Sequence, residues 1–262
     1  IFGDSLNISS VYPVILSSTG FVNNQEVHWK RTLTTSNGRC TLASAKEITA
    51  ITNEYQKRII EGDTTVVLPL VAYYGTGRLW LQHREKKEDV LLNSSRTNGY
   101  IDCMDSAAND KLIMNWLNKE TSKKLQKKTG TAAFDAVIMA IEKCISLLIE
   151  SNDVTVSYNF DNNDLDIQYK KDDQEVILPL NRMSDGYKCT ISLITDIAYR
   201  MAQLNPQLRE KVLDAPGVVI IDEIDLHLHP EWQKRILGDL TSIFPHIQFI
   251  VSTHASSVIS SV

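Results

Sequence analysis

The sequence predicts an α/β protein whose mixed sheet combines a parallel part with an antiparallel lobe and an inserted helical region. Three observations lead to this class. Residues 218–252 show strand, helix and strand with short connections, the pattern of parallel sheets. Residues 154–180 show three short strands joined by acidic turns, which is typical of an antiparallel meander. Residues 82–128 are polar and then basic, and they lead into an apolar helix.

Composition indicates an ordinary globular protein. The 262 residues are 43% hydrophobic and 23% charged, which argues against disorder and against a coiled coil. The formal net charge of −5 disfavours a globally basic nucleic-acid-binding protein. No apolar run approaches the roughly 20 residues that span a bilayer. The four cysteines are single and widely spaced, as in a reducing compartment. We therefore expect a soluble, cytoplasmic protein that does not enter a membrane.

The N-terminal part predicts a small antiparallel meander, a helix and a buried strand. Short β-branched segments at 11–15 and 27–33 are separated by Ser, Gly and Asn. Residues 44–62 predict a helix that ends at Gly62, because apolar side chains recur there every three to four residues. The unbroken apolar run 64–74 predicts a strand buried on both faces of a sheet.

The rest of the chain predicts the meander and then alternating helices and strands. In order, these elements are a helix at 132–150, strands at 154–160, 165–170 and 175–180, a helix at 185–204, a buried strand at 218–221, a helix at 230–243 and a buried strand at 247–252. The basic run 111–128 is interpreted as solvated surface, with a nucleic-acid strip as the alternative.

Two adjacent carboxylates, Asp222 and Glu223, directly follow the apolar strand. Open α/β sheets bind ligands at the C-terminal edge of their parallel strands. Adjacent side chains at a strand end point in different directions, so the two acids can do different work. Asp222 would hold a hydrated Mg²⁺, and Glu223 would orient or deprotonate a water that attacks a γ-phosphate. An acidic turn after a core strand is the structural alternative.

A histidine follows the neighbouring predicted strand, which ends in Thr253 and His254. Imidazole can hydrogen-bond a phosphate without carrying a permanent full charge. At the end of a strand next to the two acids, His254 is therefore a candidate contact to a γ-phosphate. A capping or core histidine is the alternative.

A third candidate segment lies upstream, where Ser184, Asp185 and Gly186 stand before an apolar helix. Serine and aspartate are good N-caps, and glycine lets the backbone approach a ligand closely. The exposed N–H groups and the dipole of a helix start can bind an anion. A plain helix cap is the alternative for these residues.

At these three places the chain resembles the ABC-type AAA ATPase heads of SMC-like and OLD-like proteins, which are P-loop NTPases. Residues 183–188 resemble the signature motif, in which the serine and glycine reach the γ-phosphate held by the other protomer. Residues 218–223 resemble the Walker B strand, 225–230 resemble the D-loop, and Thr253-His254 resembles the switch histidine. The resemblance implies catalytic roles for Glu223 and His254 and a metal role for Asp222. It also implies contacts to ATP from five further residues: Ser184, Asp185, Gly186, Lys188 and Asp225.

The chain departs from this family at one place, because its 262 residues contain no G-x-x-x-x-G-K-[ST] loop to cradle phosphates. In the family this loop lies N-terminal to every motif found here, and Ile1 is not a natural start. We therefore expect the loop upstream, and ATP hydrolysis depends on it. On this interpretation 1–81 form the N-terminal part of the head, 82–150 the inserted helical region, and 151–262 the signature, Walker B and switch-histidine part.

A narrower resemblance is to the ATPase subunit of Septu-type anti-phage systems and of certain retrons. It rests on Ala-Tyr-Tyr-Gly-Thr-Gly-Arg-Leu-Trp at 72–80, on 96–102 and on Trp116. It implies ATP-dependent head-to-head homodimers or higher homo-oligomers and an HNH-type (PtuB-like) nuclease partner. In retrons it also implies a reverse transcriptase with its RNA and DNA. Core and loop packing is the alternative for the aromatic residues.

The function expected from these resemblances is an ATP-binding and hydrolysing subunit of an anti-phage complex, which controls or scaffolds a nuclease. Two alternatives remain open: a non-hydrolysing scaffold of the same fold, and a stand-alone OLD/SMC-like ATPase in DNA repair. A metal-hydrolase site is a third, because His227 and His229 lie near Asp222 and Asp225 and these side chains bind divalent metals. No further histidine has suitable local spacing for it.

Overall fold

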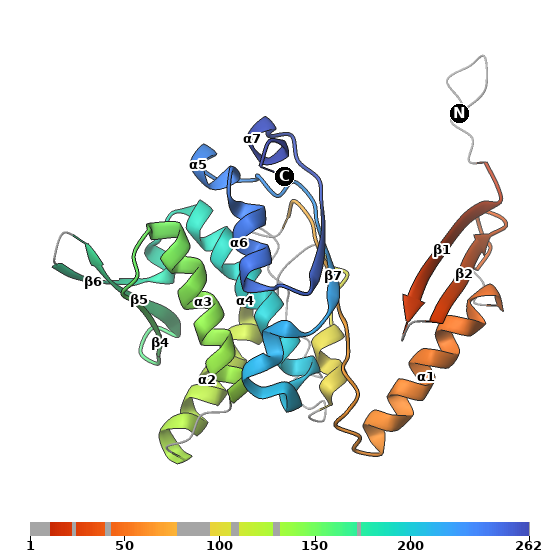
Figure 1. Ribbon diagram of the computed structural model, residues 1–262, viewed down its shortest axis with the longest axis horizontal. Helices are drawn as coiled ribbons and strands as arrows, with labels where there is room; N and C mark the ends of the chain where they lie inside the picture. Colours follow the sequence, from red (N-terminus) through yellow and green to blue (C-terminus); the bar gives the residue numbers. More distant parts are fainter. Residues whose placement is uncertain are drawn as a thin grey trace. The chain divides into compact units, whose positions relative to one another are not determined.

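The computed structural model describes residues 11–22, 25–39, 43–77, 95–105, 110–127, 132–171 and 174–261. These residues form two compact units, Ile1–Val66 and Val67–Val262 (Figure 1). Trp80 and most of the polar run that follows it lie outside the described residues. The predicted three-part division at residues 81 and 150 stays a prediction.

The first unit consists of a hairpin and a helix. Strand β1 (Val14–Val22) pairs antiparallel with β2 (Gln25–Leu33), with Val14 opposite Leu33 and Val22 opposite Gln25. A short 3-10 turn, η1 (Ala43–Ala45), leads into helix α1 (Lys46–Ile60). The predicted antiparallel pairing and helix are therefore confirmed, although the first strand extends farther along the chain than residues 11–15.

The second unit is built on a parallel sheet of three strands in the order β3 (Leu70–Tyr74), β7 (Gly217–Ile221) and β8 (Ile247–Val251). Both pairings are parallel, as the strand–helix–strand pattern predicts. The strand predicted at 64–74 begins only at Leu70. Upstream of it, the N–H and C=O groups of Leu68 each bond the side-chain amide of Asn205 at 2.8 Å. A side chain thus replaces the strand partner that this backbone would otherwise need.

The sheet is buried on one face only, so the expectation of strands buried on both faces is wrong. Leu70, Ala72, Tyr74, Val219 and Ile221 are buried. In contrast, Val71, Ile220 and Ile250, which lie on the opposite face, are 40%, 36% and 49% exposed. Successive strand side chains point to opposite faces, and an unbroken apolar sequence does not show whether both faces are covered.

Three helices contribute to the core: α2 (Asp110–Lys127), α3 (Ala132–Ile149) and α4 (Asp185–Leu204). Helices α3 and α4 run side by side, and α4 also contacts β3 (Figure 1). The largest fully buried side chains include six from these two helices: Ile141, Ile145, Ile191, Ile194, Ile197 and Met201. Trp116 of α2 packs against Phe134 and Tyr199, with ring centroids 5.9 and 5.2 Å away. Trp116 therefore packs between α3 and α4. Among the aromatic residues at 72–80, Tyr74 is buried, as the packing alternative expects.

The predicted meander is confirmed as β4 (Val154–Asn159), β5 (Asp164–Lys171) and β6 (Gln174–Pro179), which pair antiparallel in chain order. Strand β4 contacts α3. This sheet is separate from the parallel sheet in the hydrogen-bonding pattern of the described residues.

The helix predicted at 230–243 is two helices, α5 (Pro230–Gln233) and α6 (Ile236–Ile243). The helix breaks at Arg235, whose φ of −126° and ψ of −9° are not helical. The remaining short elements are η2 (Arg96–Tyr100), η3 (Leu180–Arg182), η4 (Pro206–Asp214) and α7 (Ser256–Ile259). None of the described helices is long and apolar enough to cross a membrane.

A buried ion pair joins α4 to β3 and to the segment at 96–102. The hydroxyl of Tyr74 donates to Asp196 Oδ2 at 2.6 Å, and Arg200 Nε donates to the same oxygen at 2.8 Å. Arg200 also donates to the carbonyls of Gly99 and Ile101, at 3.1 and 2.7 Å. Burial raises the pKa of Tyr74 well above its ordinary value, so its hydroxyl keeps the proton that it donates.

Close packing also explains the glycine in this segment. A Cβ on Gly99 would lie 2.6 Å from Leu204 Cγ and 2.9 Å from the Arg200 carbonyl oxygen. Arg96 donates to the Leu204 carbonyl at 2.7 Å. Residues 96–102 therefore pack along the C-terminal half of α4. This packing is a structural reason for the arginine and the glycine in the segment.

We expect Arg200→Ala to lower the free energy of unfolding by about 3 to 5 kcal/mol, because it leaves the Asp196 carboxylate buried without its partner. Tyr74→Phe removes one hydrogen bond to a charged group and is expected to cost about 2 kcal/mol. Urea denaturation measures both changes.

The matched control is Lys170→Ala, which removes an exposed ion pair with Asp153 and is expected to cost at most about 1 kcal/mol. If Arg200→Ala is no more destabilising than this control, the buried pair does not hold α4 in place.

Candidate functional site

The ends of β7 and β8 bring the two acids and the histidine to one edge of the parallel sheet. Ile221 and Val251 are register partners, so the residues after each strand emerge at the same level. Asp222 and Glu223 follow β7, and His254 follows β8. The distance from Glu223 Oε1 to His254 Nε2 is 3.9 Å. Two segments that the sequence places far apart are therefore adjacent in the fold.

Asp222 is held from both neighbouring strands. Its N–H donates to the carbonyl of Tyr74, the last residue of β3, at 2.8 Å. Its Oδ1 accepts a hydrogen bond from the hydroxyl of Ser252, the first residue after β8. The carboxylate thus sits at the middle strand of the three, at the C-terminal edge where ligands bind in such sheets.

Glu223 has an uncommon backbone conformation, with φ at +47°. Non-glycine residues rarely adopt the left-handed region, and they persist there when surrounding bonds hold them. Two such bonds are present: the Glu223 N–H donates to Ser252 Oγ at 2.8 Å, and the Glu223 carbonyl accepts from Leu226 N at 3.0 Å. The side chain of Glu223 is 37% exposed and that of His254 is 89% exposed, so a bound substrate and water can reach both.

The loop that carries His254 is tied to Asp225. The hydroxyl of Thr253 donates to Asp225 Oδ1 and accepts the N–H of Ala255 at 3.0 Å. Thr253 therefore connects the loop after β8 with the loop after β7. The sequence predicted Asp225 as a nucleotide contact, and the structure shows its bond to Thr253.

The segment at 184–188 begins α4 and packs on the loop after β7. Ser184 is the N-cap, with extended φ and ψ of −66° and 160°, and within the described chain its hydroxyl makes no capping hydrogen bond. A Cβ on Gly186 would lie 2.6 Å from the carbonyl oxygen of His227, so glycine is needed there for close backbone packing. The rings of Tyr187 and Trp232 meet edge to face at 4.4 Å. The structure thus gives Gly186 a packing role, whereas a ligand contact remains a prediction.

Asp185 and Lys188 form an exposed ion pair at the same helix start, at 2.8 Å. The hydrogen bond from the Lys188 ammonium holds the pKa of Asp185 below its ordinary value. Asp185 therefore stays ionised in the first turn of α4, where a negative charge is favourable.

The metal-hydrolase alternative finds no support in the geometry. His229 caps α5, because its Nδ1 accepts the N–H of Glu231 at 3.4 Å. Among the described residues, no group of three or more His, Cys, Asp or Glu side chains is arranged to hold a metal ion.

In the basic run at 111–128, two lysines have acidic partners. Lys123 bonds Glu120, and Lys124 bonds Asp135 at 2.7 Å.

The acids at the sheet edge fit a Mg²⁺ ion that arrives with a nucleotide. Mg²⁺ prefers oxygen ligands and is usually bound by one or two carboxylates together with substrate phosphates and water. Asp222 supplies a carboxylate, and the hydroxyl of Ser252 is hydrogen-bonded to it. A complete protein cage is not needed for this kind of binding.

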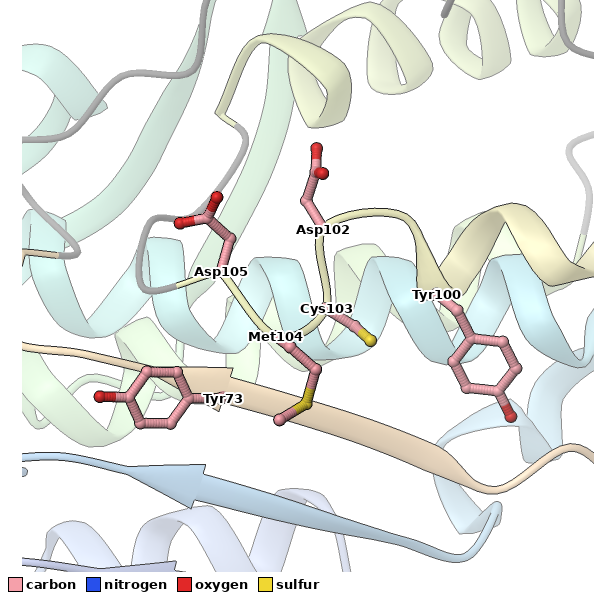
Figure 2. Close-up of a pocket in the computed structure, with 6 residues that line it drawn as sticks. All are labelled: Tyr73, Tyr100, Asp102, Cys103, Met104 and Asp105. Atoms are coloured by element: carbon pink, nitrogen blue, oxygen red, sulfur yellow. The ribbon is translucent and has the colours of Figure 1, made fainter. Parts of the chain in front are cut away.

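A second feature of the unit is an open cavity of about 670 Å³ beside β3, with six lining residues (Figure 2): Tyr73, Tyr100, Asp102, Cys103, Met104 and Asp105. Figure 2 shows the two tyrosine rings at opposite ends, with Cys103 and Met104 between them. Burial raises the pKa of Cys103, so the thiol stays protonated and is a poor nucleophile. Burial also raises the pKa of Tyr100 to about 12. Neither the thiol nor this phenol is therefore an activated nucleophile at neutral pH.

Sequence analysis missed Ser252 and Thr253 as part of the site. It assigned Ser252 to the strand and used Thr253 only to mark the histidine motif. Two hydroxyl residues directly before a histidine at a strand end were the available signal, since such side chains hydrogen-bond neighbouring carboxylates and backbone groups.

Comparisons with known proteins agree with the expected family. A family model described as an AAA ATPase domain matches residues 30–259. The retron Vc95 probable ATPase of Vibrio cholerae serotype O1 biovar El Tor is 52% identical over 80 residues, which cover 30% of this chain and 15% of that protein. The retron Ec83 probable ATPase of Escherichia coli is 48% identical over 87 residues, or 33% of this chain and 16% of that protein.

The Septu protein PtuA of Bacillus mycoides (strain KBAB4) is 48% identical over 75 residues, or 29% of this chain and 10% of that protein. These matches thus span less than a fifth of each relative's length. The solved SMC head domain from Thermotoga maritima aligns over 98% of this chain and 70% of that chain at 16% identity. Its TM-score is 0.47, a likeness too low to support a conclusion. On the strength of the family match over residues 30–259, this chain belongs to the AAA ATPase domain family.

Proposed function

We propose that this chain binds and hydrolyses ATP at the edge of the sheet formed by the ends of β7 and β8. The observation that carries the proposal is the meeting of Asp222, Glu223 and His254 at one exposed edge, with Glu223 and His254 3.9 Å apart. A carboxylate for a metal, a second for water and an imidazole for phosphate are three of the groups that can serve phosphoryl transfer to water, and the phosphate-binding loop expected upstream would complete the site.

Each residue has a separate role in the proposed reaction. Asp222 would hold Mg²⁺, which when bound neutralises charge on the phosphate oxygens. Glu223 would orient the attacking water and accept its proton, because a carboxylate within hydrogen-bond reach of a water can act as a general base. His254 would donate a hydrogen bond to the γ-phosphate from its exposed ring. Attack would be in line with the bond to the leaving phosphate.

Glu223→Gln tests the assignment of the base. In the full-length protein we expect kcat for ATP hydrolysis to fall by about 10² to 10⁴, because the amide cannot accept the proton of the water. ATP affinity is expected to persist, since glutamine has the shape of glutamate. A phosphate-release assay and a binding titration measure the two quantities.

Glu210→Gln, an exposed acid on η4, is the matched control and should leave turnover unchanged. Unchanged turnover in Glu223→Gln would show that the catalytic assignment is wrong. A wild-type protein that binds ATP without hydrolysing it would instead favour a non-hydrolysing scaffold.

The signature segment would act on the ATP of a second copy of the chain. Ser184 is exposed at the start of α4, and Gly186 and Tyr187 join this helix start to the loop that follows Glu223. Asp185, Lys188 and Asp225 would contribute to the same binding surface. Two such surfaces facing one another would complete two ATP sites, which matches the twofold symmetry of most homodimers.

Mixing two inactive variants tests this shared site. Each proposed site has an acid side, which is Asp222, Glu223 and His254 of one chain, and a signature side, which begins at Ser184 of the other chain. Glu223→Gln disables the acid side and Ser184→Arg disables the signature side. A mixed dimer therefore retains one site with both sides intact. With free exchange of subunits, an equal mixture should recover about one quarter of wild-type turnover.

The control mixture contains Glu223→Gln and His254→Ala, whose defects lie on the same side of the site. It should recover no activity, because every site then has a defective acid side. Equal recovery in the two mixtures, or none in either, would show that the sites are not shared between two chains.

The biological setting we propose is an anti-phage defence complex in the cytoplasm. Support comes from the relatives, which are two probable retron ATPases and a Septu protein. The Septu resemblance extends the proposal to an HNH-type nuclease partner and, in the retron case, a reverse transcriptase with its RNA and DNA. ATP-dependent dimerisation, or assembly into a higher oligomer, would then control the nuclease or hold it in place.

A further inference from the structure

Ser252 makes hydrogen bonds to four consecutive residues of the loop that carries the acids. Its N–H donates to the Ile221 carbonyl at 3.0 Å, and its carbonyl accepts the N–H of Ile224 at 3.0 Å. Its hydroxyl donates to Asp222 Oδ1 and accepts the N–H of Glu223 at 2.8 Å. Ser252, the first residue after β8, thus contacts each residue from Ile221 to Ile224.

The directions of the two hydroxyl bonds follow from chemistry. An ionised carboxylate only accepts hydrogen bonds, and a backbone N–H only donates them. A serine hydroxyl has one proton to donate and two lone pairs to accept with, so Ser252 can serve Asp222 and Glu223 at the same time. Neither alanine nor valine can replace it in both bonds.

We propose that Ser252 is the positioning residue of this site. Its donated bond orients the Asp222 carboxylate, and its accepted bond holds Glu223 in the left-handed backbone conformation at φ +47°. Because Thr253 and His254 follow directly, Ser252 also fixes the distance between the acids and the imidazole. Its action on the reaction is indirect: it touches the acids, and they touch metal and water. This role rests on the proposed function.

Hydrogen-bond partners behind a metal ligand typically change metal affinity or activity by 10- to 100-fold when they are removed. Ser252 is exposed, so water can satisfy the groups that Ser252→Ala leaves behind, and the variant is expected to fold. A loss of function in this variant would therefore report on positioning.

The first experiment measures amide hydrogen exchange by mass spectrometry on peptides that span residues 221–226, without nucleotide. In Ser252→Ala we expect exchange at Glu223 to be about tenfold faster, because its N–H has lost its acceptor. Ser252→Thr keeps a hydroxyl on the same carbon and should restore slow exchange. Identical exchange in wild type and Ser252→Ala would overturn the proposal, whether or not the protein hydrolyses ATP.

The second experiment measures affinity for a fluorescent ATP analogue with and without Mg²⁺, using the full-length protein. We expect Ser252→Ala to lose about tenfold of the affinity gained from Mg²⁺ and to keep the metal-free affinity. Ser252→Thr should recover the gain. Ser242→Ala, which removes an exposed hydroxyl bonded only to its own helix backbone in the described structure, should match wild type in both assays.

The outcomes distinguish the positioning role of Ser252 from the proposed ATP site. If wild type gains no affinity from Mg²⁺, the proposed function fails, and the exchange result alone decides the role of Ser252. If wild type gains affinity and Ser252→Ala gains it equally, the positioning role is wrong while the ATP site stands.

Discussion

The site depends on the parallel register between β7 and β8. Because Ile221 lies opposite Val251, the residues that follow the two strands emerge side by side, and short side chains can join them. A shift of one residue would turn every side chain of β8 to the other face of the sheet and separate Ser252 from the acids. The backbone pairing that builds the sheet therefore also determines the geometry of the acids and the histidine.

The helices add a second constraint. Tyr74 contributes its carbonyl to the N–H of Asp222 and its hydroxyl to Asp196 of α4, so one residue connects the acid pair to the long helix that begins at Ser184. At the other end, Gly186 packs on the carbonyl of His227. Helix α4 is thus attached to the sheet edge at two places. The family match extends over both.

The cavity beside β3 and the edge at Asp222 differ in chemistry. The cavity has two carboxylates and a thiol whose pKa burial raises, but none of its six described lining residues is an imidazole or a cation that could bind a phosphate. The edge at Asp222 combines acids, hydroxyls and an exposed imidazole: Ser252 is hydrogen-bonded to Asp222, and Glu223 Oε1 lies 3.9 Å from His254 Nε2. For this reason we propose the edge, rather than the cavity, as the site.

Local pattern was enough to locate the helix at 185–204, the meander, and the acids and histidine that follow buried strands. Periodicity, capping residues and motif order are relations between residues that are near one another in the chain. The helix, the meander and the positions of the acids and the histidine follow from such local relations. Only the tertiary structure decided that Glu223 is left-handed, that Ser252 holds it, and that Gly186 meets a carbonyl. Those contacts join residues about thirty to forty positions apart, and they exist only once strands and helices have packed.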